Sequence, residues 1–186
     1  FLENHDEQRL ASTFFAGNPL KGKAPLLVSA LMYTNPMMIY FGQELGEKGM
    51  DAEGFSGEDG RTTIFDYWTV DTIRRWRNNG KFDQKLLTED ELSLQEYYAK
   101  VLNICNSSEA VKEGEFYDLM YVNPQLQKQY TFVRHSEKET LLVIANFASQ
   151  DTEITINVPE HLFEYYGIKE NTACEWTDLL SGSQIT

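Results

Sequence analysis

Apolar residues recur at intervals of three and four in two stretches of the first hundred residues. The first stretch, 23–33, predicts an amphipathic helix. The second starts with Thr88 and Glu91, which form a capping-box pattern, and its apolar residues keep the same period as far as Cys105. Asp71 can cap a third, shorter helix. The first part of the chain is therefore predicted to contain at least three helices.

Two short apolar runs without helical spacing lie around the first of these helices. Met37–Phe41 is wholly apolar, which is typical of a strand buried on both faces in a parallel sheet. Phe1-Leu2 runs directly into a polar cluster and resembles the end of another strand. The start lacks an initiator Met and a leader, so we expect an internal piece of a longer protein. The order strand, helix, strand, long loop, helix favours an α/β unit.

From about residue 115 the pattern changes to β-branched and aromatic runs separated by short polar turns. We expect antiparallel strands there and place a boundary near 108–114, with one domain at 1–108 and a second at 109–186. The predicted strands are Glu115–Val122, Gln129–His135, Thr140–Phe147, Thr152–Val158 and, less clearly marked, Thr172–Leu179.

Composition narrows the classes of function. The chain of 186 residues has 41% hydrophobic residues and a net charge of −13. This acidity argues against nucleic acid and anionic membranes as partners, since both require basic surfaces. No apolar run approaches the roughly 20 residues of a membrane-spanning helix. The two cysteines, Cys105 and Cys174, have neither disulfide-framework nor zinc-site spacing.

The strongest candidate for chemistry is Asn4-His5-Asp6, at the end of the first apolar run. A carboxylate stabilises positive charge, and planar polar side chains bond vicinal hydroxyls, so the group could be catalytic or grip a sugar. The alternative is a polar loop that caps the next helix. Gly42-Gln43-Glu44 follows the second apolar run and is either a turn with an exposed acid or a second group at the same site.

Other polar and aromatic residues allow two interpretations. Four residues lie in or after the acidic loop, namely Arg61, Asp66, Tyr67 and Trp68, and the aromatic ones could stack on a sugar ring or anchor the loop. His135 and His161 have no metal-like spacing and are interpreted as structural or solvated. An acidic run could hold calcium, but a solvated loop fits its spacing better, because it does not match an EF-hand. The run comprises Glu47, Asp51, Glu53, Glu58 and Asp59.

Taken together, these segments resemble glycoside hydrolase family 13, the α-amylase family. Phe1-x-x-Asn4-His5-Asp6 is similar to the motif that ends the seventh barrel strand, and Pro36–Glu44 is similar to the eighth-strand motif. Asn35-Pro36 and Phe41 depart from the usual eighth-strand pattern. Ala110-Val111-Lys112-x-Gly114 resembles the segment that leads into the family's C-terminal β-domain, and Leu141–Phe147 resembles a central strand of that domain.

The resemblance implies a fold and a set of site residues. The fold is an α/β remnant of a (β/α)8 TIM barrel followed by an all-β antiparallel sandwich. Asp6 is implied to stabilise the transition state and His5 to contact the sugar. The implied substrate-binding set is His5, Asn4, Arg9, Gln43 and Glu44. The resemblance implies no cofactor or metal in this part of the protein, although calcium would fit the intact enzyme.

The resemblance also implies what the chain cannot do alone. The family's nucleophile and acid/base carboxylates would lie upstream of Phe1, so this fragment is expected to be inactive. The intact enzyme would act on starch, glycogen or a maltooligosaccharide. The alternatives are a transglycosylase or isomerase of the same family, or a non-catalytic sugar-binding or structural β-module. The exposed barrel remnant could associate with a second copy, and the cellular location stays open.

Overall fold

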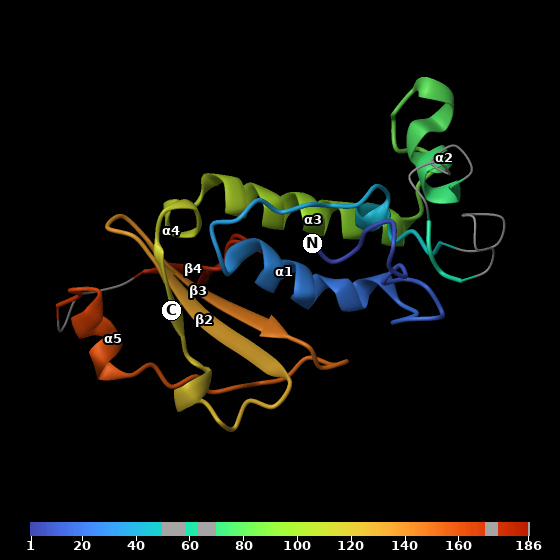
Figure 1. Ribbon diagram of the computed structural model, residues 1–186. Coiled ribbons are helices and arrows are strands. Elements are labelled where there is room, and N and C mark those ends of the chain that lie inside the picture. Colours follow the sequence, from blue (N-terminus) through green and yellow to red (C-terminus); the bar gives the residue numbers. More distant parts are fainter. Residues whose placement is uncertain (50–58, 63–69, 170–174, 186) are drawn as a thin grey trace. The chain divides into compact units, whose positions relative to one another are not determined.

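The computed structural model describes residues 1–49, 59–62, 70–169 and 175–185. The chain forms two compact units (Figure 1). The first comprises Phe1–Ser29 and Pro36–Ala99, and the second comprises Ala30–Asn35 and Lys100–Thr186. The division falls inside the helix Glu89–Ser107, and the domain boundary near 108–114 stays a prediction.

The described part of the first unit is helical. It contains η1 (Pro19–Gly22), α1 (Lys23–Leu31), η2 (Gln43–Leu45), α2 (Asp71–Arg77), η3 (Asn78–Gly80) and α3 (Glu89–Ser107), of which α1 and α3 continue into the second unit. The predicted helices at 23–33 and after Thr88 are confirmed. Asp71 is not a cap, because Val70 is the N-cap of α2 and Asp71 is the first helical residue.

The start of α3 has the capping geometry that its sequence predicts. Thr88 Oγ1 accepts a hydrogen bond from the backbone N–H of Glu91 at 3.2 Å, and a Glu91 carboxylate oxygen accepts one from the Thr88 N–H at 2.9 Å. Arg75 of α2 donates to both oxygens of the same carboxylate. Glu91 therefore caps the N-terminus of α3 and also binds α2 through Arg75.

The two apolar runs of the first unit do not form strands, contrary to the prediction. None of the described residues of this unit belongs to a strand. Met37–Phe41 is not buried on both faces, since Met38 is 45% exposed while Tyr40 is buried. The Tyr40 N–H bonds the Gln43 side chain instead of a neighbouring strand. An apolar run becomes a strand only where a partner backbone lies beside it.

The core of the first unit forms between α1, η2 and α3. Leu26, Leu45 and Leu94 are almost fully buried. The Tyr97 hydroxyl on α3 donates to the carbonyl of Lys23 at the start of α1. Gly46 ends η2 with a positive φ of 73°, and a Cβ there would lie 2.9 Å from Pro19, so only glycine fits this close approach.

The second unit is built on a three-stranded antiparallel sheet in the order β1-β2-β3. The strands are β1 (Glu115–Asp118), β2 (Gln129–His135) and β3 (Thr140–Asn146), with Phe132 opposite Val143 and Tyr117 opposite Val133. The prediction of a strand at Gln129–His135 is confirmed at both ends. Both faces of the sheet are covered at β2, where four consecutive residues are buried.

Both faces of β2 pack against specific partners. On one face, Val133 lies in a core cluster with Leu119 and with Leu162 of α5 (Glu160–Tyr165). On the other face, the Phe132 ring lies 5.4 Å from the Phe116 ring. β2 is therefore buried over the four residues Thr131–Arg134, whereas buried and exposed residues alternate at the end of β3.

Arg134 of β2 holds the short helix α4 (Glu109–Lys112) beside the sheet. Its buried guanidinium donates to the carbonyls of Ala110 at 3.1 Å, Val111 at 3.0 Å and Gly114 at 2.6 Å. The Ala110 carbonyl also accepts from the Gly114 N–H at 3.1 Å, and the guanidinium supplies a charged donor to all three carbonyls at the C-terminal end of α4. Ser108 caps the other end through its side chain. The segment before the sheet is thus fixed at both ends.

The rest of the second unit departs from the predicted sandwich. Thr152–Val158 alternates as a strand would, but it forms no strand, and α5 follows it without a prediction. Within Thr172–Leu179, the described part contains β4 (Trp176–Thr177), which pairs with β5 (Gln184–Ile185). A mixed α/β chain with a three-stranded antiparallel sheet is observed. The barrel remnant and the sandwich remain predictions.

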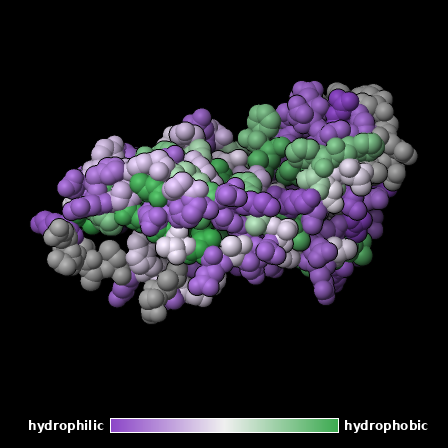
Figure 2. Space-filling model, turned by 90° about the horizontal axis from the view of Figure 1, so that it is seen from below, coloured by the Kyte–Doolittle hydropathy of each residue, from purple (hydrophilic) through white to green (hydrophobic). Residues whose placement is uncertain are grey.

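Apolar side chains also reach the surface. Figure 2 shows hydrophobic residues among hydrophilic ones on one face of the molecule. In the first unit, the most exposed large ones are Phe1 at 67% and Phe15 at 65%, with Phe14 and Met38 close to half exposed.

Candidate functional site

The Asn4–Asp6 segment forms a tight polar turn. Asn4 Oδ1 accepts hydrogen bonds from the backbone N–H groups of Asp6 at 2.8 Å and Glu7 at 2.9 Å, as an Asx turn does. The side chains of His5 and Asp6 are 59% and 75% exposed, with His5 Nε2 3.4 Å from Asp6 Oδ2. The loop therefore presents one imidazole and one carboxylate to solvent, while Asn4 shapes it.

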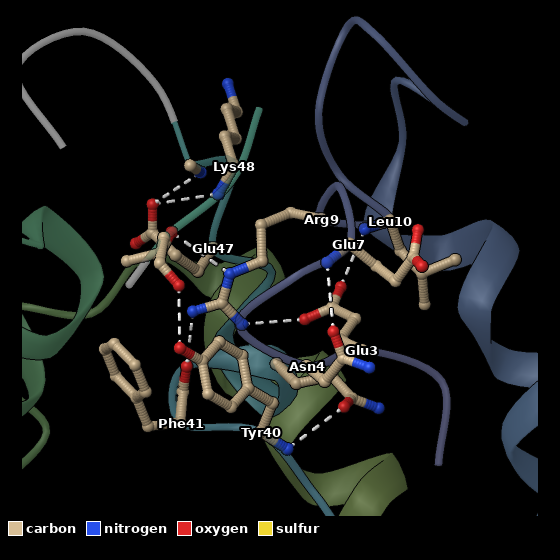
Figure 3. Close-up of polar contacts among 12 residues, drawn as sticks. Glu3, Asn4, Glu7, Arg9, Leu10, Tyr40, Phe41, Glu47 and Lys48 are labelled. Atoms are coloured by element: carbon tan, nitrogen blue, oxygen red, sulfur yellow. Dashed lines mark hydrogen bonds and ion pairs between the residues drawn. The ribbon is translucent and has the colours of Figure 1, made fainter. Parts of the chain in front are cut away.

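Arg9 lies beneath this turn and is fully buried (Figure 3). Its Nη1 contacts Glu3 Oε2 at 2.8 Å, and its Nη2 donates to the Phe41 carbonyl at 2.7 Å. Its Nε donates to Thr62 Oγ1 at 3.2 Å, and the guanidinium carbon lies 4.4 Å from the centre of the Tyr40 ring. One side chain thus joins the segments that contain the two sequence motifs.

Glu3 binds Arg9 and also the backbone at the end of the same loop. One carboxylate oxygen accepts from Arg9, and the other accepts from the Leu10 N–H at 2.7 Å. Burial raises the pKa of Glu3, and the nearby Arg9 charge offsets part of that effect. The residues between Glu3 and Leu10 are therefore closed into a loop with Asp6 near its tip.

The Gly42–Glu44 turn is fixed by Gln43. Gln43 Oε1 accepts from the Tyr40 N–H at 3.2 Å, and its Nε2 donates to the Tyr98 hydroxyl at 3.1 Å. Gly42 has a φ of 79°, a conformation that glycine adopts without strain. Burial raises the pKa of Tyr98 to about 12. The amide of Gln43 is thus a structural tie between the turn and α3.

Glu44 differs from Gln43 because it remains half-buried. Burial raises the pKa of Glu44, although its own backbone and the charge of Arg9 favour the ionised form. The charge of Glu3 contributes in the same direction as burial. Glu44 consequently binds a proton more readily than a solvated glutamate does.

The acidic run does not assemble a calcium site in the described residues. Glu47 is buried, and its Oε2 accepts from the Thr72 hydroxyl at 2.5 Å while Oε1 accepts from the N–H groups of Lys48 and Gly49. Asp59 binds Arg61. The rest of the run, Asp51, Glu53 and Glu58, lies outside the described residues. Within the described ranges, no group of three or more acidic, histidine or cysteine side chains could hold a metal.

The structure separates the predicted site residues into two groups. His5, Asp6 and Glu44 have surface to offer a ligand. Arg9 and Gln43 are buried and bonded within the protein, and their contact with a substrate stays a prediction. Sequence reasoning missed Glu3. Its signal is an acid directly after an apolar pair and six residues before an arginine, because a buried acid needs a cation beside it.

The remaining candidates have structural surroundings where they are described. Arg61 bonds Asp59 and, at 3.4 Å, the Asp6 carbonyl, while Asp66, Tyr67 and Trp68 lie outside the described residues. His135 stacks on Tyr166 with ring centres 4.1 Å apart. His161 shares a hydrogen-bonded cluster with two tyrosine hydroxyls, those of Tyr117 and Tyr121.

Comparison with protein-family models, curated proteins and solved structures gave no match. No helix in the described part of the chain has the length and apolar character needed to cross a membrane. Any assignment of function therefore depends on the residues and geometry given above.

Proposed function

We propose that this chain is the C-terminal part of a retaining α-glucan-active glycoside hydrolase that resembles the α-amylase family. The observation that carries the proposal is Arg9, which joins the two segments that resemble the seventh- and eighth-strand motifs. Its guanidinium donates to the Phe41 carbonyl and lies against the Tyr40 ring. Neighbouring barrel strands must end side by side at the active-site face, so this contact supports the resemblance.

Asp6 is the residue that would act on the reacting sugar. Its carboxylate is exposed, and its loop is closed by Asn4 above and by the Glu3–Arg9 pair below. A fixed carboxylate can stabilise the positive charge of an oxocarbenium-like transition state. His5 beside it would bond a sugar hydroxyl. Glu44 on the neighbouring segment is the second accessible acid of the proposed site.

The proposal requires two further carboxylates, a nucleophile and an acid/base, on the barrel strands that would precede Phe1. The 186-residue chain alone should therefore release no reducing ends from amylose. Release by the pure, folded chain would contradict the proposal, because it would mean that this part holds a complete catalytic set.

The direct test is Asp6→Asn in the intact enzyme. We expect kcat to fall about 100-fold or more, since a charge that acts on the transition state is removed. Glu7→Gln is the matched control, because Glu7 is an exposed acid in the same loop. His5→Ala should mainly raise KM, by about 2- to 10-fold, because a neutral hydrogen bond to substrate and transition state alike affects binding. Near-normal turnover of Asp6→Asn would remove the proposed role.

A further inference from the structure

A cavity of about 540 Å³ opens in the second unit, at the end of the β2–β3 hairpin. Its wall is formed by residues near the end of α4, the start of β1, the hairpin turn and the end of α5, elements that can be followed in Figure 1. The residues on which the argument depends are His135, Glu137, Lys138, Glu115, Tyr165 and Tyr166. This volume lies within the usual range of small-molecule sites, about 300–1,000 Å³.

One side of the cavity is aromatic. Tyr166 and His135 stack with their rings 29° apart, and the Tyr165 ring centre lies 5.2 Å from that of Tyr166. Tyr165 is 61% exposed, so much of its ring remains available to a ligand. Burial lowers the pKa of His135, which keeps this imidazole neutral at pH 7. The aromatic wall therefore carries no positive charge.

The other side of the cavity is polar and accepts hydrogen bonds. Of its carboxylates, Glu109 pairs with Lys138 at 2.7 Å, and a hydrogen bond to Glu115 raises the pKa of the Tyr165 hydroxyl. Glu113 and Glu137 also line the cavity. Two of the four carboxylates thus already have partners within the protein. Within the described ranges, no trio of ligating side chains converges on a metal position.

We propose that this cavity is an accessory carbohydrate site that binds glucose units of an α-glucan chain. A pyranose ring has an apolar C–H face, which can stack on Tyr165, and hydroxyl donors at its edge, which match carboxylate acceptors. The identity of the sugar rests on the proposed function, while the site itself rests on the cavity. Its role would be to hold the polymer at a point separate from Asp6.

The test uses the 186-residue chain and maltoheptaose as the probe, with binding measured by calorimetry and by affinity electrophoresis in glycogen gels. Tyr165→Ala should weaken binding about tenfold, as truncation of an exposed aromatic anchor commonly does. Phe163→Ala is the matched control, since Phe163 is an exposed aromatic on the same helix that does not line the cavity. Glu137→Gln should weaken binding less than Tyr165→Ala does.

Three further outcomes decide the proposal. A loss of maltoheptaose affinity in Asp6→Asn that exceeds the loss in Tyr165→Ala would place the sugar at the other site and overturn the proposal. Equal affinity of Tyr165→Ala and the parent chain would overturn the proposal. Spermidine binding that depends on Tyr165, without maltoheptaose binding, would also overturn it in favour of an amine site. If Tyr165 governs binding but Asp6→Asn retains turnover in the intact enzyme, the accessory site stands and the proposed function fails.

Discussion

Arg9 and Glu3 form an ion pair with 2.8 Å between Nη1 and Oε2, and their side chains are 0% and 2% exposed. A buried pair of this kind loses hydration on both partners, and it is favourable only where further hydrogen bonds satisfy the remaining groups. Thr62, the Phe41 carbonyl and the Leu10 N–H supply those bonds. The pair therefore ties the Asp6 loop to the next segment, which makes it a positioning device for the proposed site.

The first prediction concerns this pair. Arg9→Met alone should lower the free energy of unfolding by about 3–5 kcal/mol, because it leaves Glu3 charged and unpaired in the interior. The double variant Arg9→Met with Glu3→Leu should recover much of that loss, since no buried charge remains. Urea unfolding of the four proteins in a double-mutant cycle measures the coupling.

A matched control tests whether the loss of stability comes from burial of the ion pair. Arg61→Met is the matched control, because Arg61 forms an ion pair that is much more exposed, and the change should alter stability by less than about 1 kcal/mol. If Arg9→Met proved as mild as Arg61→Met, the buried pair would not hold the loop as described.

The role of Arg9 shows where sequence reasoning stops. The resemblance to a known motif placed Arg9 and Gln43 among substrate-binding residues, because both lie near the motif ends. Their burial depends on residues distant in sequence, such as Thr62 and Tyr98. Spacing along the chain cannot show whether a polar side chain near a motif points into solvent or into the protein.

The second prediction is a pH dependence from Glu44. Its pKa is raised above the ordinary 4.5 by burial, so the folded state binds this proton more tightly than the unfolded state does. Its contribution to stability is present below pH 4.5 and is lost as pH rises through the folded pKa. Glu44→Gln should therefore raise the Tm at pH 7 and leave it nearly unchanged at pH 4. Thermal unfolding at both pH values measures this, and a lower Tm at pH 7 would contradict it.

The third prediction is that Glu91 gives stability the opposite dependence on pH. Burial alone would raise its pKa, but bonds from Arg75 and Thr88 outweigh burial and lower it. Its stabilising effect is present above pH 4.5 and is lost as pH falls through the folded pKa. Glu91→Gln should lower stability by about 1–2 kcal/mol at pH 7. A loss of equal size at pH 7 and at pH 3 would show that its charge is not involved.

The helices and the strands of this chain differ in how well sequence predicts them. The capping pair Thr88 and Glu91 lies three residues apart, so a local pattern contains the whole interaction. β2 was also predictable, because its β-branched and aromatic residues are bounded by polar turns. Met37–Phe41 and Thr152–Val158 have strand-like patterns as well, but strand pairing depends on a distant partner that no local pattern encodes.

The fourth prediction concerns Arg134 in the second unit. Arg134→Met should lower the free energy of unfolding by about 2–4 kcal/mol, because the carbonyls of Ala110, Val111 and Gly114 lose their charged donor. Lys112→Met is the control, since Lys112 lies on the same short helix and is exposed. Faster amide exchange across α4 in the Arg134 variant, with little change in α2, would confirm the local effect. Equal exchange in both variants would contradict it.

The last prediction concerns association of the chain with a second copy. Phe1 is 67% exposed and Met38 is 45% exposed, and both belong to segments that resemble barrel strand ends. Exposed apolar side chains favour association. Sedimentation velocity of the 186-residue chain should show a concentration-dependent larger species, which Phe1→Ser with Met38→Ser reduces. Leu86→Ser is the control, because Leu86 is 50% exposed but lies outside both segments. A strictly monomeric chain at all concentrations would mean that these segments are stable without a partner.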